Sequence, residues 1–167
     1  MGHHPGSARR GRAFTFIELV IVVLVLAIAA TVALGAFADV DATQRADRAG
    51  QELATAFRYA RMRAMSTGYA YGVSVSATGF AVVYQTVPGG PWLTESNPLG
   101  GGSYRITLAD SSLLAGSAIT PPAGVTQPMT YRTTGSRSVG GTATITISCG
   151  GRTCRVTVPP VGEPTVQ

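Results

Sequence analysis

The chain has 167 residues, enough for one domain plus a membrane segment, and it contains 13 arginines and no lysine. Its formal net charge of +5 suggests a membrane-surface or nucleic-acid partner. Residues 14–167, however, contain ten arginines and eight acidic residues, so their net charge is +2. Both histidines, His3 and His4, lie in that leader, which argues against histidine-based catalysis. With no P-loop and no G-x-S-x-G motif either, we expect no enzyme, metal, cofactor or small-molecule substrate.

The first element in the chain is a long apolar run. Leu19–Ala38 is twenty residues with Thr31 as the clearly polar member, and Arg9, Arg10 and Arg12 precede it. About 20 apolar residues span a bilayer as a helix, and arginines in front of the run predict a cytoplasmic N-terminus. We therefore expect residues 14–38 to form the transmembrane half of a helix, with the rest of the chain outside the cytoplasm.

A glutamate, Glu18, stands at the start of this run. Thr15-Phe16-Ile17-Glu18 has the form of a capping box, with Thr15 as the helix cap, so a plain signal anchor explains the carboxylate locally. An ordinary secretory signal peptide is a second alternative, because Ala36-Phe37-Ala38 has the pattern of an A-x-A cleavage site. Its apolar run would be longer than the usual one.

A third interpretation accounts for the whole stretch "RGRAFTFIELVIVV". It resembles the processing site of type IV pilins and type II secretion pseudopilins: a basic leader, a small residue, a phenylalanine, then Thr-x-x-Glu opening an apolar helix. The resemblance implies a leader peptide at 1–13, cleavage by prepilin peptidase between Ala13 and Phe14, and N-methylation of Phe14. Alanine stands at position 13 where glycine is usual in the family.

The resemblance also implies a role for Glu18. A lone carboxylate near lipid costs about 2.5–3.5 kcal/mol on insertion scales, so it persists where it has a partner. In the family, the equivalent glutamate pairs with the N-terminal amine of a neighbouring subunit as it enters a filament. Glu18 would then be the residue that sets the register of assembly.

The helical pattern continues beyond the apolar run. Residues 39–66 contain no proline, and the apolar positions recur every three or four residues. This stripe comprises Ala46, Ala49, Leu53, Phe57, Ala60 and Ala64. We expect an amphipathic outer half of the same helix, whose arginines at 45, 48, 58, 61 and 63 form a solvated face with local ion pairs such as Asp41–Arg45. A basic binding strip is the alternative.

After Gly68 the period changes from 3.6 to 2, which predicts short strands. A hairpin is expected around Ala77-Thr78-Gly79, loops over 87–103 and 109–127, and a disordered tail over 159–167. The predicted strands are 69–75, 80–85, 104–108, 129–132, 142–148 and 155–158. The fold class is α+β: a long transmembrane-plus-amphipathic helix packed on a small antiparallel β-sandwich over 69–158.

Two further blocks, "ELATAFRYARMRAMSTGYAYGVSV" and "MTYRTTGSRSVGGTATITI", resemble one branch of the family, the GspH/FimT-type minor pseudopilins and minor pilins. This resemblance implies a low-copy subunit near the tip of a filament, with other pilin-like subunits as partners. The implied location is the bacterial inner membrane, with a periplasmic C-terminal domain, and then a periplasm-spanning filament. The machine is a type II secretion pseudopilus or, alternatively, a type IV pilus.

Two cysteines, Cys149 and Cys154, flank a four-residue segment between predicted strands. A hairpin could bring them within disulfide range, and an exported domain favours oxidation. The alternative is a pair of free buried thiols.

Four arginines, Arg132, Arg137, Arg152 and Arg155, lie on the last predicted hairpins. Some FimT-like relatives bind DNA through an arginine-rich C-terminal segment, so these residues are candidate phosphate contacts. The chain ends in "VGEPTVQ", however, with Glu163 where a positive charge would be expected, and there is little aromatic interleaving for stacking on bases. DNA binding is therefore the minor alternative to ordinary exposed strand residues.

Overall fold

The computed structural model describes residues 15–98, 100–111, 114–124, 128–138 and 140–167. The chain divides into two units, Met1–Ala38 and Asp39–Gln167. The long helix α1 (Phe16–Thr67) has residues in both units. We call its residues 16–38 the inner half and its residues 39–67 the outer half. The prediction that the helix continues beyond Ala38 into residues 39–66 is thus confirmed.

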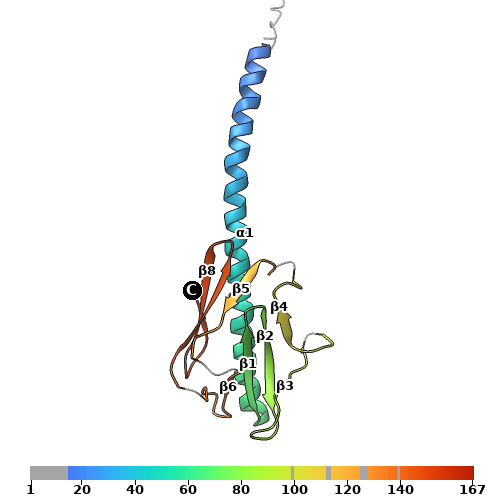
Figure 1. Ribbon diagram of the computed structural model, residues 1–167, viewed down its shortest axis with the longest axis vertical. Helices are drawn as coiled ribbons and strands as arrows, with labels where there is room; N and C mark the ends of the chain where they lie inside the picture. The colour runs from blue at the N-terminus through green and yellow to red at the C-terminus, as the bar shows by residue number, and fades with distance from the viewer. Residues whose placement is uncertain (1–14, 99, 112–113, 125–127, 139) are drawn as a thin grey trace, which may run out of the picture. The chain divides into compact units, whose positions relative to one another are not determined.

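The second unit contains two antiparallel sheets (Figure 1). In the first sheet the strand order is β3-β2-β1-β6, and β4 also pairs with β2, so two short strands share one edge of β2. In the second sheet the order is β5-β7-β8-β9. The strands are β1 (Ala70–Ser76), β2 (Gly79–Gln85), β3 (Leu93–Thr94), β4 (Arg105–Thr107), β5 (Ser117–Thr120), β6 (Met129–Tyr131), β7 (Ala143–Cys149), β8 (Arg152–Val158) and β9 (Thr165–Val166).

Tight turns set the register of the two main hairpins. Ser76 pairs with Gly79 across the β1–β2 turn, close to the predicted position. A side chain at Gly79 would come within 2.2 Å of the carbonyl oxygen of Ile106 on β4, so glycine is needed where β4 approaches. The β7–β8 turn is Gly150-Gly151, and both residues have positive φ angles of 55° and 81°, as a two-residue primed turn requires.

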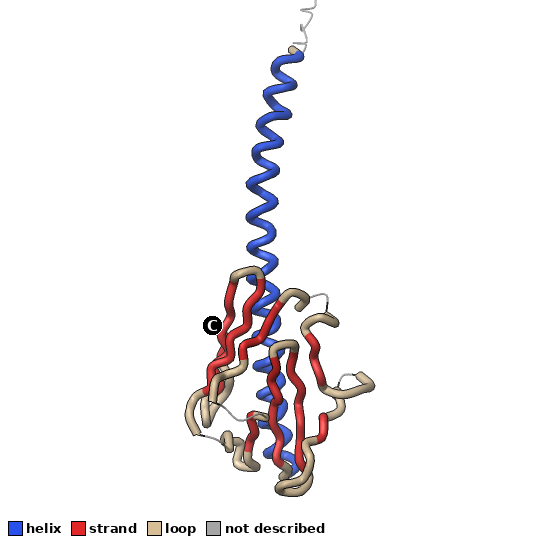
Figure 2. The backbone as a smooth tube through the Cα atoms, in the orientation of Figure 1, coloured by secondary structure: helices blue, strands red, loops and turns tan. Residues whose placement is uncertain are grey.

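Both sheets pack on the outer half of α1 and share one hydrophobic core with it (Figure 2). All six residues of the predicted apolar stripe, from Ala46 to Ala64, are at most 1% exposed. The alanines let the sheets approach closely, while Phe57 fills the centre with its ring edge-on to Tyr131 at 6.4 Å between centroids. The predicted α+β fold, with the helix packed on antiparallel sheets, is therefore confirmed.

The structure corrects three predictions about the connecting segments. Strand β3 lies within the predicted loop 87–103, and β5 lies within the predicted loop 109–127. The C-terminal tail was predicted to be disordered, but it forms β9 on the edge of β8 and buries Pro164. Strands β3 and β9 have only two residues each and pair with the strand that precedes them, and β5 pairs with β7, which is distant in the sequence, so local composition carries little signal for these strands.

Candidate functional site

The start of α1 has the cap that the sequence predicts. Thr15 precedes the first helical residue, and its Oγ1 accepts a long hydrogen bond of 3.4 Å from the backbone N–H of Glu18. The carbonyl of Thr15 accepts the N–H groups of Glu18 and Leu19 at 3.1 and 3.2 Å. Glu18 lies in the first turn, where a carboxylate complements the helix dipole. Ala13 and Phe14, the predicted cleavage and methylation residues, lie outside the described residues.

Residues 16–31 of α1 expose an apolar surface on every side. All side chains from 15 to 31 are exposed, with Phe16 at 82% and Ile28 at 59%. The hydroxyl of Thr31 donates a hydrogen bond of 2.7 Å to the backbone carbonyl of Ile28. Apolar patches of this extent mark contact surfaces rather than ordinary solvent-facing helices.

The helical residues that the structure describes in full include no stretch both long and apolar enough to cross a membrane.

Four of the five arginines of the outer half, all except Arg48, donate to groups of the second unit, and this corrects the prediction that they form only a solvated face with local ion pairs. Arg45 makes the predicted ion pair with Asp41 at 2.6 Å, but it also donates to the carbonyl of Ala115 at 3.0 Å. Arg58 and Arg61 hold the tail: they donate to the carbonyls of Pro164 and Gly162 at 3.4 and 2.8 Å. Arg58 also pairs with Glu163 at 3.4 Å.

A buried carboxylate joins the end of α1 to the loop after β3. Glu95 is 8% exposed, accepts from Arg63 Nη2 at 3.2 Å and from the hydroxyl of Tyr71 at 2.9 Å. The guanidinium of Arg63 lies 5.6 Å from the centre of the Tyr71 ring. Burial and the hydrogen bond to Glu95 raise the pKa of Tyr71. Sequence analysis missed this network because Glu95 is a lone acid in a Gly/Pro-rich loop, 32 residues from Arg63.

The structure also corrects the predicted disulfide, because Cys149 and Cys154 are both free, buried thiols. The tight Gly150-Gly151 turn places Cys149 opposite Arg152, and Cys154 opposite Ile147. The cysteines are thus diagonal neighbours, for which Cα atoms lie about 7–8 Å apart, beyond the usual disulfide spacing. Both sulfurs pack on Ala46 of α1, and burial raises the pKa of the Cys154 thiol.

The four candidate DNA contacts do not form one surface. Arg137 is 6% exposed and donates to the carbonyl of Val158 at 2.7 Å, and burial lowers its pKa. Arg132 is exposed and donates to the carbonyl of Ser138 at 3.5 Å. Arg152 and Arg155 are exposed but lie three residues apart on β8, so the strand directs them to opposite faces.

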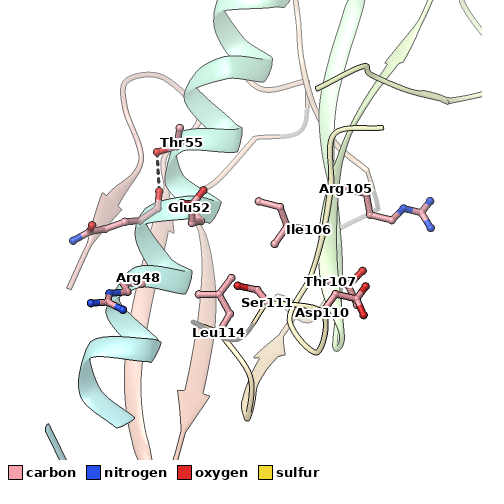
Figure 3. A pocket seen from close by; sticks show the side chains of 10 residues that line it. Arg48, Glu52, Thr55, Arg105, Ile106, Thr107, Asp110, Ser111 and Leu114 are labelled. Carbon is pink, nitrogen blue, oxygen red and sulfur yellow. Dashed lines mark hydrogen bonds between the residues drawn. The ribbon is translucent and has the colours of Figure 1, made fainter. Parts of the chain in front are cut away.

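A groove of about 530 Å³ lies between α1 and β4 and is called the α1–β4 groove (Figure 3). Among the lining residues, Arg48 and Glu52 belong to α1, and Arg105 and Asp110 belong to β4 and the turn that follows it. In Figure 3 the guanidinium groups of Arg48 and Arg105 point away from the space between α1 and β4. The apolar side chains of Ile106 and Leu114 lie between the walls. The remaining lining residues are Gln51, Thr55, Thr107 and Ser111. The groove therefore has an apolar centre, and no local sequence pattern indicates it.

The model of a family described as type II transport protein GspH matches residues 49–162, which is more than half of the chain. The chain belongs to the GspH family. The matched region contains most of the outer half of α1 and the strands β1–β8, so the GspH assignment rests on the second unit. A search of curated proteins gave no match.

Solved structures agree with the GspH fold. The minor pseudopilin EpsH from the type 2 secretion system of Vibrio cholerae superposes in two structures, with TM-scores of 0.56 and 0.52 and identities of 18% and 16%. Each match covers 74% of this chain, and 96% and 94% of the EpsH chains. The type IV minor pilin FimU from Pseudomonas aeruginosa has a TM-score of 0.50 and 16% identity, with coverage of 72% and 90%. At these identities the likeness establishes the pilin-like fold.

Proposed function

We propose that this GspH-family chain is a minor pseudopilin, made as an inner-membrane precursor and built into a periplasmic type II secretion filament. Its role is structural rather than catalytic. The family assignment and the EpsH-like fold support the class of protein. The observation that carries the proposal is the contrast within α1: the side chains of residues 16–31 are exposed and mostly apolar, while the apolar face of the outer half is buried in the hydrophobic core.

The exposed apolar side chains of α1 need apolar surroundings, and we propose that lipid supplies them first and neighbouring subunits supply them in the filament. The run Leu19–Ala38 is long enough to lie in a bilayer, and the leader arginines favour a cytoplasmic N-terminus. Thr31 already satisfies its hydroxyl within the helix, as a polar side chain in lipid must. In the filament the same surface packs on the helices of neighbouring pilin-like subunits, which replaces lipid contacts by helix contacts.

The transfer of the helix from lipid to filament depends on two charged groups, the carboxylate of Glu18 and the amine of the new N-terminus. Prepilin peptidase cleaves between Ala13 and Phe14, and the released amine of Phe14 is methylated but stays cationic. A carboxylate in lipid is costly by about 2.5–3.5 kcal/mol, and pairing with an amine of a neighbouring subunit removes part of that cost. Glu18 is exposed in the first turn of α1, so its carboxylate is available for such a contact.

Mass spectrometry of the mature N-terminus from native membranes tests the first step. A chain that begins at methylated Phe14 supports the proposal, whereas a chain that begins at Asp39 means an ordinary signal peptide and overturns it. Glu18→Ala then tests assembly: we expect normal processing with loss of incorporation into sheared filaments. Glu18→Asp, which keeps the charge, is the matched variant and should retain more incorporation than Glu18→Ala.

DNA binding is the alternative that a type IV pilus role would favour. The burial of Arg137 and the opposed faces of Arg152 and Arg155 weigh against a single phosphate-binding surface. A gel-shift series with the full chain at rising salt distinguishes the two roles. Retardation that falls steeply with salt, and that is lost in Arg152→Ala plus Arg155→Ala, would favour the DNA-binding role.

A further inference from the structure

The first sheet carries a second, smaller cavity, with a volume of about 240 Å³, which is lined by residues of β1, β2 and β4. Strand β2 lies between the other two strands and forms the floor, while β1 and β4 form the walls. Because neighbouring strands are about 4.8 Å apart, the two walls are about 10 Å apart. We call this cavity the β1–β4 trough.

The alternation of side chains along each strand decides which residues face the trough. Val75, Phe80 and Ile106 are aligned across the three strands and pack in the hydrophobic core. Their neighbours in the sequence therefore face the opposite side of the sheet, where they form two rows with a small residue in the middle and polar side chains at the ends. The first row is Ser74, Ala81 and Arg105, and the second row is Ser76, Gly79 and Thr107.

The floor of the trough is hollow because β2 contributes almost no side-chain volume there. Gly79 has no side chain, and Ala81 has one methyl group and is 7% exposed. Glycine is required at position 79, since a Cβ atom there would lie 2.2 Å from the carbonyl oxygen of Ile106. The close approach of β4 therefore keeps the space above β2 open.

The polar groups around the trough include donors that the fold leaves without an acceptor. Arg105 is exposed and makes no side-chain hydrogen bond or ion pair within the described part of the chain. Its guanidinium points away from the space between α1 and β4 (Figure 3), as the alternation along β4 requires. Among the described residues, the hydroxyls of Ser74, Thr78 and Thr107 also have no hydrogen-bond partner. Ser76 differs, because its hydroxyl donates to a backbone carbonyl at 2.9 Å. None of the residues that line the trough is acidic.

This set of groups favours a carboxylate as the ligand. A guanidinium presents two parallel N–H donors that match the two oxygens of a carboxylate, and hydroxyls can donate to the remaining lone pairs. One carboxylate neutralises one arginine, whereas a phosphate monoester brings about 1.5–2 negative charges. A cation is repelled by the guanidinium, and an apolar group leaves the donors unpaired.

We propose that the β1–β4 trough binds one carboxylate group, held by the guanidinium of Arg105 and the hydroxyls of Ser74 and Thr107. The inference goes beyond the proposed function and does not depend on it, because it concerns a ligand of the second unit alone. A free small carboxylate and an acidic side chain of another protein both supply the required group, and the experiments below distinguish these two sources.

Nuclear magnetic resonance of the arginine Nε–H groups tests the site, with the full chain in detergent and acetate as the probe. Acetate replaces chloride at constant ionic strength, and Arg105→Lys assigns the resonance. We expect a saturable shift of the Arg105 resonance, with at least about tenfold higher affinity for acetate than for chloride. Arg155, exposed on β8, is the control in the same spectrum and should show no saturable shift. If Arg105 responds as Arg155 does, or binds phosphate more tightly than acetate, the inference is overturned.

Two variants that keep Arg105 test whether the trough itself contributes to binding. Thr107→Val keeps the shape of the side chain and removes one hydroxyl donor, so it should weaken acetate binding about three- to tenfold. Ala81→Leu fills the space above β2 and should abolish the saturable shift. Thr144→Val on the exposed face of β7 is the matched control and should leave the affinity unchanged. Parental affinity in Thr107→Val contradicts the inference, whether or not Ala81→Leu folds.

A photo-crosslinking amino acid at Thr78, an exposed residue at the rim of the trough, identifies the source of the carboxylate in the native host. A product that joins position 78 to a protein segment containing Asp or Glu, and that Arg105→Gln reduces at least about tenfold, assigns the carboxylate to a protein side chain. If acetate binds but no such product forms, the ligand is a free small carboxylate. If acetate does not bind and no such product forms, the inference is wrong.

Discussion

The two halves of α1 belong to one helix but differ in how their apolar side chains are covered. In the inner half, every side chain from 16 to 31 is exposed, and the apolar residues follow no stripe. In the outer half, one face of small residues is buried in the core, and the arginines beside it bind strands, loops and the tail. A helix that is apolar on every side needs an external cover, whereas a helix with one apolar face is already covered by its own domain.

The largest expected effect comes from removing the same side chain in each half. Phe57→Ala deletes a ring that is 0% exposed and should cost about 3–5 kcal/mol of the free energy of unfolding. Phe16→Ala removes an 82%-exposed ring and should change it by less than about 0.5 kcal/mol. Chemical denaturation of the full chain in detergent, followed by fluorescence of the single Trp92, measures both. Equal losses would mean that the inner half is part of the folded domain.

The next effect is a loss of stability at high pH, which we expect from the core that packs on the outer half of α1. Tyr131 packs on Phe57, and burial raises its pKa from 10.0 to about 12. The folded state then holds the phenol proton at a pH where the unfolded chain releases it. Stability is therefore full below pH 10 and falls as the pH rises from about 10 to about 12, by about 3 kcal/mol in total.

Denaturation midpoints between pH 8 and pH 12 measure this loss. Tyr131→Phe is the matched control, because it keeps the ring and removes the phenol, whose oxygen has no hydrogen-bond partner within the described residues. The variant should lack this part of the pH dependence. An identical alkaline slope in the variant and the parent would show that another group is responsible.

A smaller effect tests how closely the outer half approaches the second sheet. A side chain at Gly50 would come within 2.7 Å of Cys154 Sγ and 3.2 Å of Val166 Cγ1. Alanine favours a helix over glycine by about 1 kcal/mol, but overpacking costs about 1–3 kcal/mol, so Gly50→Ala should be destabilising on balance. Adding Cys154→Ala should recover part of the loss in a double-mutant cycle. If the stability changes of the two substitutions were strictly additive, Cys154 would not contact the side chain introduced at position 50.

The smallest effect concerns the tail. The Arg58–Glu163 pair is 49% and 69% exposed, so Arg58→Ala should cost less than about 1 kcal/mol. It should nevertheless speed amide hydrogen exchange in β9, because local opening of the tail becomes easier. Arg48→Ala, in the α1–β4 groove, is the control and should leave exchange in β9 unchanged. Similar acceleration in both variants would contradict a specific role for Arg58.

Much of the fold could be predicted because its signals are local. The helical period of Ala49, Leu53 and Phe57, the change to strand alternation after Gly68 and the β1–β2 turn all depend on neighbouring residues. The features that were not predicted depend on contacts with residues that are distant in the sequence. Strand β5 forms by pairing with β7, and β9 forms because β8 offers an edge and Arg58 and Arg61 bind the tail.

The helix, its change from uniformly apolar to one-sided, and the type of protein follow from the residues alone, because periodicity and the residues around Glu18 require no knowledge of distant contacts. Tertiary contacts are needed to show which groups the arginines bind, that Cys149 and Cys154 stay free, and that α1 and β4 line one groove. Register and burial decide those outcomes, since a shift of one residue in β7–β8 pairing reverses which side chains meet.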